Sequence, residues 1–125
     1  MRCSALAPIA LTICLASCGV SDTAREEAIL LTGGDPDNGI SAIGRYGCGS
    51  CHDIPGIRSA RGTVGPPLGG IATRTYLAGR LSNSPANMMR WIQHPQHVVR
   101  GTAMPEMGVT DIDARDITAF LYTLR

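Results

Sequence analysis

The sequence predicts a small all-α domain. Its 125 residues suffice for one domain, and apolar residues recur at helical spacing in three stretches, near 37–46, 85–94 and 111–124. The segments between these stretches are rich in glycine and proline, and none shows the alternation that is typical of a β-strand. We therefore expect three or four short helices joined by loops, in a domain that covers residues 37–125.

The first 17 residues have the pattern of a secretion signal. Arg2 provides an early positive charge, and the apolar run over 5–16 that follows is too short to span a bilayer. The run ends in Leu15-Ala16-Ser17-Cys18, which resembles the lipobox of bacterial lipoproteins. This resemblance implies a signal peptide over 1–17 and a lipid on Cys18, the first residue of the mature chain.

Lipidation of Cys18 implies an exported protein at the periplasmic or outer face of a bacterial membrane. The acyl chains would anchor it there, because each buried methylene stabilises membrane binding by about 0.8 kcal/mol. The alternative is that Cys18 is one more apolar residue of the signal, with cleavage after Ser21 or Ala24. Export excludes a nucleic-acid partner. Residues 18–36 carry little apolar surface beyond 29–31, so we expect a flexible tether there.

Each predicted helix has a recognisable start. Asp37 or Asn38 can cap the first helix, and Thr110 can cap the last. Ser84 and Pro85 suit the N-cap and the first position of the middle helix. The apolar faces expected to pack inward are Ile40, Ile43 and Tyr46 in the first helix, Met88, Trp91 and Ile92 in the second, and Ile112, Ile117, Phe120, Leu121 and Leu124 in the third.

The pentapeptide Cys48-Gly49-Ser50-Cys51-His52 is the strongest chemical signal in the chain. A Cys-x-x-Cys-His sequence is the attachment motif of c-type haem. The two thiols can add to the two vinyl groups of the porphyrin, and the imidazole that follows can then reach the iron. The sequence therefore predicts one covalent haem c, bound by Cys48 and Cys51 and ligated by His52.

Three other interpretations of the cysteine pair remain open. A zinc site needs two more ligands, which His94 and His97 could supply. A thioredoxin-like redox pair would follow a strand in a βαβ unit, and the chain shows no such pattern. The third is a chance match that carries no cofactor. A haem would, however, supply hydrophobic mass to a domain with one Phe, one Trp and three Tyr.

Two further motifs follow the pentapeptide, Gly65-Pro66-Pro67-Leu68 and Met104-Pro105, before the last helix. In this order they resemble the motifs of class I (monohaem) cytochromes c, over residues 37–125. The resemblance implies the all-α class I cytochrome c fold, with short helices around one covalent haem and the first and last helices crossing at a small residue. The residues expected at this crossing are Gly39 and Ile43 on one helix and Ile117 and Phe120 on the other.

The resemblance also implies roles on the proximal side of the haem. His52 would ligate the iron, and the carbonyl of Pro66 would accept a hydrogen bond from its Nδ1 and fix the ring. Leu68 would line a haem face. Candidates for contact with the haem propionates are Trp91, Arg74 and Arg80. The alternatives are core packing for the tryptophan and solvated surface charge for the arginines.

On the distal side, the resemblance implies that Met104 is the second iron ligand, a thioether that raises the reduction potential. Met107 is the main alternative because it lies three residues further along the same loop. His94 or His97 is another. The pair His52 and Met104 would complete an iron site with no open position, which argues against a peroxidase or gas-binding site.

The longer run over 62–124 includes Ala78-Gly79-Arg80-Leu81, Pro85, Trp91-Ile92, Pro95 and Gly101-Thr102-Ala103-Met104-Pro105. With these residues it resembles the cytochrome c domain fused to subunit II of some bacterial haem–copper oxidases. It implies a carrier of single electrons in a respiratory chain, with redox protein partners such as the copper-bearing subunit of a terminal oxidase and with no small-molecule substrate. The alternatives are the haem subunit of a membrane dehydrogenase and a haem peroxidase or sensor with an open sixth site.

The charge distribution bears on the partner. Once residues 1–17 are removed, ten arginines stand against ten acidic residues. Between residues 44 and 105, however, there are seven arginines and Asp53 is the sole acidic residue. A basic rim of this kind favours an acidic docking partner; the alternative is an ordinary solvated surface.

Overall fold

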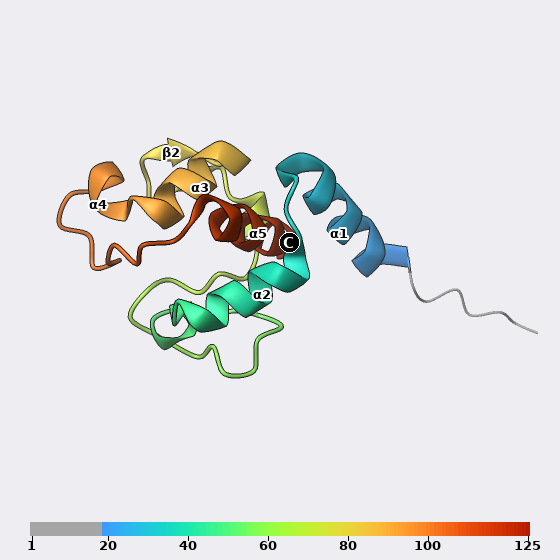
Figure 1. Ribbon diagram of the computed structural model, residues 1–125, viewed down its shortest axis with the longest axis horizontal. Helices are drawn as coiled ribbons and strands as arrows, with labels where there is room; N and C mark the ends of the chain where they lie inside the picture. Colours follow the sequence, from blue (N-terminus) through green and yellow to red (C-terminus); the bar gives the residue numbers. More distant parts are fainter. Residues whose placement is uncertain (1–18) are drawn as a thin grey trace, which may run out of the picture.

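The structure, a computed structural model, describes residues 19–125; the predicted signal peptide (1–17) and Cys18 lie outside the described residues. Figure 1 shows the helices gathered around α5 (Asp111–Tyr122), with α2 (Pro36–Arg45) on one side, α3 (Pro85–Gln93) on another and α1 (Gly19–Thr32) beyond them. The short helix α4 (Pro95–Val98) follows α3. The predicted all-α class is confirmed.

The centre of the core is α5, because three helices pack against it. Every residue of α5 from 116 to 122 is buried. Ile117 and Phe120 are 2% and 5% exposed, and Ile43 of α2 is 2% exposed. Ile112 was expected in the apolar stripe but is 70% exposed, because the buried side of the first turn of α5 is the one that carries Ala114, which is fully buried.

Helices α2 and α5 approach each other closely at Gly39. A Cβ atom at this position would overlap the carbonyl oxygen of Asp116 and lie 3.0 Å from the Cβ of Phe120. The helix axes can approach this closely only without a side chain at the contact. The predicted crossing of the first and last helices at a small residue is confirmed.

Local sequence determines where these helices begin. The side chains of Ser84 and Thr110 accept hydrogen bonds from backbone N–H groups in the first turns of α3 and α5, as predicted. Helix α2 starts two to three residues earlier than expected. Its N-cap is Asp35, which accepts from the N–H of Asp37 at 2.9 Å and precedes Pro36, a favoured first residue.

The prediction of a flexible tether over 18–36 is wrong for the described part of that segment, which contains the 14-residue helix α1. Ala28 of α1 is 1% exposed, and α1 packs against α5. Arg25 forms two hydrogen bonds with Asp37, at 3.1 and 2.7 Å, and Glu27 pairs with Arg125 at 2.5 Å. Such contacts stabilise a helix whose own sequence carries little apolar periodicity.

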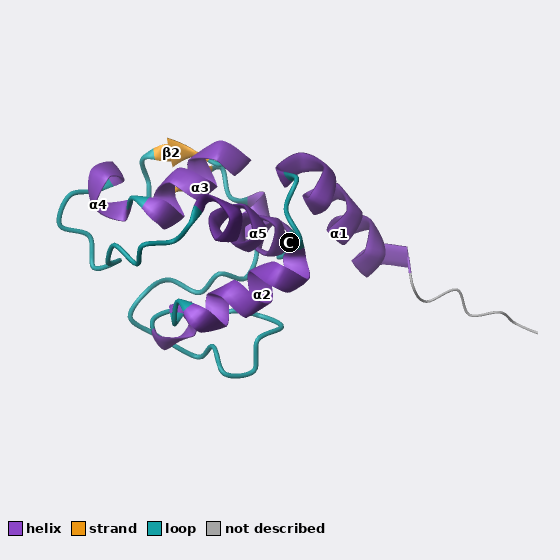
Figure 2. Cartoon of the chain, viewed as in Figure 1, coloured by secondary structure: helices purple, strands orange, loops and turns teal. Residues whose placement is uncertain are grey.

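The rest of the described chain is mainly loop, as Figure 2 shows. It contains two short 3₁₀ helices, η1 (Cys48–Ser50) and η2 (Ile71–Thr73), and a small antiparallel pair of strands, β1 (Tyr76–Leu77) and β2 (Leu81–Ser82), which was not predicted. A strand of two residues is too short to show the alternation of apolar and polar residues from which strands are predicted. Within residues 19–125, no helix is both long enough and apolar enough to cross a membrane.

We expect Gly39→Ala to lower the free energy of unfolding by about 1–3 kcal/mol, because the added methyl group overlaps the backbone of α5. Gly44→Ala in the same helix is the matched control. A Cβ there has no neighbour within 4 Å, so it should be neutral or stabilise by up to about 1 kcal/mol. Urea unfolding of both variants measures the difference, and equal effects at the two positions would contradict the proposed contact.

Candidate functional site

A cavity of about 530 Å³ lies between the segments 46–68 and 102–107 and extends to β1 and α3. This volume is within the range of roughly 300–1,000 Å³ that is usual for ligand and cofactor sites. Most of its wall is apolar. The cavity brings together the predicted haem-binding residues Cys48, Cys51, His52, Pro66, Leu68, Trp91 and Met104. The predicted lipidation site, Cys18, lies outside the described residues.

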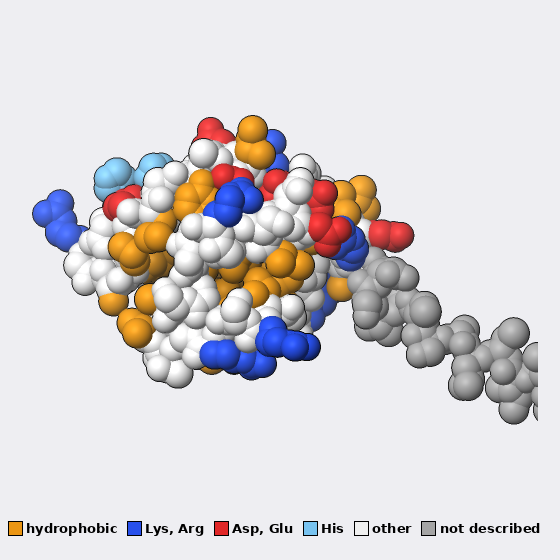
Figure 3. All heavy atoms as spheres, turned by 60° about the horizontal axis from the view of Figure 1, so that its bottom comes forward, with side chains coloured by type: hydrophobic (Ala, Val, Ile, Leu, Met, Phe, Trp, Pro, Cys, Tyr) orange, Lys and Arg blue, Asp and Glu red, His pale blue; other side chains and the backbone are white. Residues whose placement is uncertain are grey.

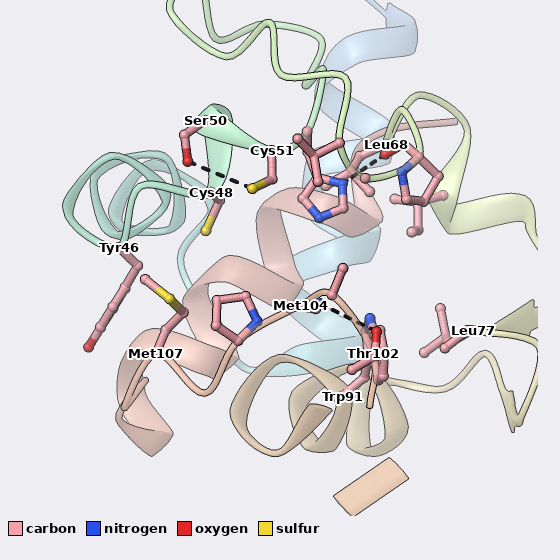
Figure 4. A pocket seen from close by; sticks show the side chains of 18 of the residues that line it. Tyr46, Cys48, Ser50, Cys51, Leu68, Leu77, Trp91, Thr102, Met104 and Met107 are labelled. Carbon is pink, nitrogen blue, oxygen red and sulfur yellow. Dashed lines mark hydrogen bonds between the residues drawn. The ribbon is translucent and has the colours of Figure 1, made fainter. Parts of the chain in front are cut away.

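One wall carries the two cysteines. Cys48 begins η1, and the backbone N–H groups of Cys51 and His52 both donate to its carbonyl, at 3.2 and 3.0 Å. This tight turn directs both thiols to the same side, and Figure 4 shows them across the cavity from Thr102, Met104 and Trp91. Both cysteines are free thiols in the chain, so both can form thioethers.

The structure argues against the two alternative uses of this cysteine pair. Burial raises the pKa of the Cys48 thiol, whereas a thioredoxin-like pair needs a lowered thiol pKa. Among residues 19–125, no three His, Cys, Asp or Glu side chains are grouped so that they could hold a metal ion. The zinc interpretation therefore has no ligand set in the described chain.

The orientation of His52 is fixed by its neighbours. Its Nδ1 lies 2.8 Å from the carbonyl oxygen of Pro66, as expected from the resemblance. A carbonyl can only accept, so Nδ1 carries the proton and Nε2 is left as the nitrogen that can bind a metal. Gly65 packs against the ring so closely that a Cβ there would overlap it. The backbone therefore holds the imidazole on two sides.

Backbone hydrogen bonds attach the loop over 62–68 to the pentapeptide and to Asp53, which follows it. Gly62, Gly65 and Leu68 donate to the carbonyls of Gly49, Cys51 and Asp53, at 3.0, 2.7 and 2.9 Å respectively.

Of the two candidate propionate arginines, Arg74 lines the cavity and donates from Nη2 to the carbonyls of Pro67, at 2.6 Å, and Gly69, at 3.2 Å. Its guanidinium thus bonds directly to the loop over 62–70, called the proximal loop below because its Pro66 carbonyl contacts His52. Arg80 precedes β2 and is not among the lining residues.

The opposite wall carries two methionines. Met104 is half-buried and Met107 is 41% exposed, and both line the cavity (Figure 4). His94 and His97 do not line it. Their rings stack on each other with centroids 5.4 Å apart, and Nδ1 of His94 lies 3.8 Å from Glu106. The structure thus places both candidate methionines at the cavity and neither candidate histidine.

Tyr46 was expected only as a core residue, yet it lines the cavity and joins the two walls. Its hydroxyl donates to Asp113 of α5 at 2.8 Å, and Arg45 and Thr110 bond to the same carboxylate at 2.6 and 3.0 Å. The hydrogen bond from Tyr46 holds the pKa of Asp113 below its ordinary value, with smaller contributions from Thr110 and Arg45, although desolvation acts in the other direction. The sequence offers no signal for this long-range cluster.

A small helical domain that presents two adjacent thiols, a fixed imidazole and a thioether to one apolar cavity has the features of a c-type cytochrome. Comparison with known proteins agrees. The family model for cytochrome c matches residues 38–125. A cytochrome c2 of Rhodopila globiformis is 34% identical over 106 residues, which cover 74% of this chain and 95% of that protein. No solved structure is significantly similar to the chain.

The chain therefore belongs to the cytochrome c family and is a monohaem class I cytochrome c, an electron carrier. Family membership implies a covalent haem c. The cavity fits such a group: its wall is apolar, its volume is that of a cofactor site, and the sulfur and nitrogen donors lie on its surface.

The lowered pKa of Asp113 predicts how stability depends on pH. A carboxyl with a depressed pKa in the folded state stabilises the protein above its ordinary pKa of 3.8, and this contribution is lost as the pH falls through the folded-state value. Asp113→Asn should therefore be less stable than the wild type at pH 7, and the difference should shrink below about pH 4.

Urea unfolding of the haem-loaded proteins at a series of pH values measures this difference. Glu26→Gln, which removes an exposed carboxylate from α1, is the control and should change little. A wild-type advantage over Asp113→Asn that stays constant down to pH 2 would refute the assignment.

Proposed function

We propose that this protein is a membrane-tethered cytochrome that passes single electrons in a respiratory chain, to or from a haem–copper oxidase. Cys48 and Cys51 would attach the haem through thioethers, and His52 and Met104 would be its axial ligands. When bound, the haem supplies a one-electron ferric/ferrous couple. The observation that carries the proposal is that His52 and Met104 line one cavity from two different segments of the chain.

The surrounding residues have complementary tasks in this proposal. The carbonyl of Pro66 holds the imidazole of His52 in one tautomer. Leu68 and Trp91 contribute apolar surface to the cavity wall, against which the haem would pack. A thioether is a neutral, weakly basic ligand, so Met104 favours the reduced metal and raises the potential. Because both axial positions would be filled by the protein, this arrangement favours electron transfer over peroxidase chemistry or ligand sensing.

The membrane attachment is proposed from the lipobox, and the position of α1 bears on how far the domain would lie from the anchor. Cys18 directly precedes α1 in the sequence, and α1 packs on α5. A lipid on Cys18 would therefore be joined to the domain without a long flexible segment. This would keep the cavity close to the membrane, where respiratory complexes are embedded.

The partner is proposed from charge. The part of the chain between residues 44 and 105, which supplies nearly all of the cavity lining, contains seven arginines, while most acidic residues belong to α1, α2 and α5. Figure 3 shows a group of basic side chains along the lower border of one face, whereas the acidic side chains lie in its upper part, with further basic side chains beside them. Such an asymmetry favours an acidic partner surface, as expected for the copper-bearing subunit of an oxidase.

Met104→Ala should abolish the weak long-wavelength absorption band that Met–iron ligation gives in ferric c-type cytochromes, and should lower the reduction potential. Met107→Ala is the matched control, because Met107 lines the same cavity three residues along, and it should retain the band. Spectra of both proteins matured with haem test this. A band lost only in Met107→Ala would reassign the ligand. Absence of the band from the wild type would favour an open or histidine-ligated site, as in a peroxidase or sensor.

Replacement of Cys18 tests the anchor. In a bacterium that matures lipoproteins and cytochromes c, we expect the wild type in the membrane fraction, resistant to a high-salt wash and released by detergent. Cys18→Ser should move the haem protein to the soluble fraction with its visible spectrum unchanged. Retention of Cys18→Ser in the membrane would show that the cysteine is not the anchor.

Ionic strength tests the partner. The rate at which the reduced protein transfers electrons to a soluble copper-bearing oxidase domain should fall as salt rises. Arg100→Gln, next to the Met104 loop, should slow the reaction at low salt, whereas Arg115→Gln on α5 should not. A rate that is independent of salt, or equal effects of the two substitutions, would count against docking through the arginine-rich rim.

A further inference from the structure

Gln96 makes an unusual set of contacts with the loop that carries Met104. Its side-chain Nε2 donates to the carbonyls of Thr102 and Met104, both at 2.8 Å, and its Oε1 accepts from the N–H of Gly101 at 3.1 Å. Both N–H groups of the amide and its oxygen are therefore used. One half-buried side chain bonds to three backbone positions within four residues of loop.

This loop has little regular hydrogen bonding of its own. Residues 101–110 contain no helix or strand. The N–H of Met104 makes a long contact of 3.4 Å with the hydroxyl of Thr102, and the residue after Met104 is Pro105, which has no N–H to offer. The bond from Gln96 to the Met104 carbonyl is therefore the shortest that the structure gives for the backbone of this residue.

Gln96 is itself held firmly. Pro95, which precedes it, is almost completely buried. The backbone N–H of Gln96 donates to Oε1 of Glu106 at 3.1 Å. Glu106 follows the Met104-Pro105 pair, so bonds between α4 and the loop fall on both sides of Met104. The Gln96 side chain is thus a fixed support rather than a mobile surface group.

We propose that Gln96 is a positioning residue that keeps the Met104 thioether at the distal side of the haem and so controls how readily Met104 leaves the iron. This inference rests on the proposed function, in which Met104 is the distal ligand. A thioether binds weakly, so its occupancy depends on how often the loop opens. An added ligand can bind only those molecules in which Met104 has left the iron. Its apparent affinity therefore reports the fraction of molecules that are open.

The experiment titrates the ferric, haem-loaded protein with imidazole and follows the Met–iron absorption band. In Gln96→Ala, half-displacement of the band is expected at about a tenfold lower imidazole concentration than in the wild type. A tenfold change corresponds to about 1.4 kcal/mol, on the scale of one net hydrogen bond.

Gln93→Ala is the matched control. Gln93 lies three residues earlier and donates to the Val109 carbonyl at 3.3 Å and to Asp111 at 2.7 Å. It therefore supports the chain beyond Met107 rather than the Met104 backbone. Its replacement should lower global stability but leave the imidazole midpoint near that of the wild type. If the imidazole midpoint depended only on global stability, Gln96→Ala and Gln93→Ala would shift it alike.

Equal midpoints for the wild type and Gln96→Ala would overturn the proposal, as would equal shifts in Gln96→Ala and Gln93→Ala. If Gln96→Ala does not accumulate with haem, Gln96→Glu takes its place. Its carboxylate cannot donate to the two carbonyls at neutral pH, so the same two outcomes apply.

Failure of the proposed function would be seen separately. In that case the wild type would lack the band, or Met104→Ala would keep it, before any Gln96 variant is compared.

Discussion

The contact between Gly39 and the backbone of α5 is the constraint on which the rest of the structure depends. It allows α2 and α5 to approach closely at Asp116, and the two helices lead to the two walls of the cavity. The end of α2 leads directly to Cys48, and the start of α5 receives the chain from Met107. The hydrogen bond between Tyr46 and Asp113 links the end of α2 to the start of α5, nearer the cavity. The separation of the walls therefore follows from helix packing.

Both walls are loops whose shape is maintained by side chains bonded to backbone carbonyls. Arg74 supports the proximal loop at Pro67 and Gly69. Gln96 supports the loop that carries Met104, at the carbonyls of Thr102 and Met104. Segments rich in glycine and proline cannot form regular ladders, so their carbonyls need other donors. Guanidinium and amide groups supply several donors from one side chain, which allows an irregular segment to keep a defined shape beside an apolar cavity.

Helix α1 is an addition to the family domain, since the cytochrome c family match begins at residue 38. It buries Ala28 and forms ion pairs with residues at both ends of the domain, Asp37 and Arg125. The segment between the proposed lipid and the haem domain is therefore part of the folded structure.

The sequence by itself determined the features that depend on near neighbours: the all-α class, the caps at Ser84 and Thr110, and the turn that brings Cys48, Cys51 and His52 together. Local rules suffice because each involves residues within about one helical turn. Helix α1, the exposure of Ile112, the Tyr46–Asp113 cluster and the support by Gln96 were decided only by the tertiary structure. Their partners lie farther away along the chain, and such contacts exist only after packing has chosen which surfaces meet.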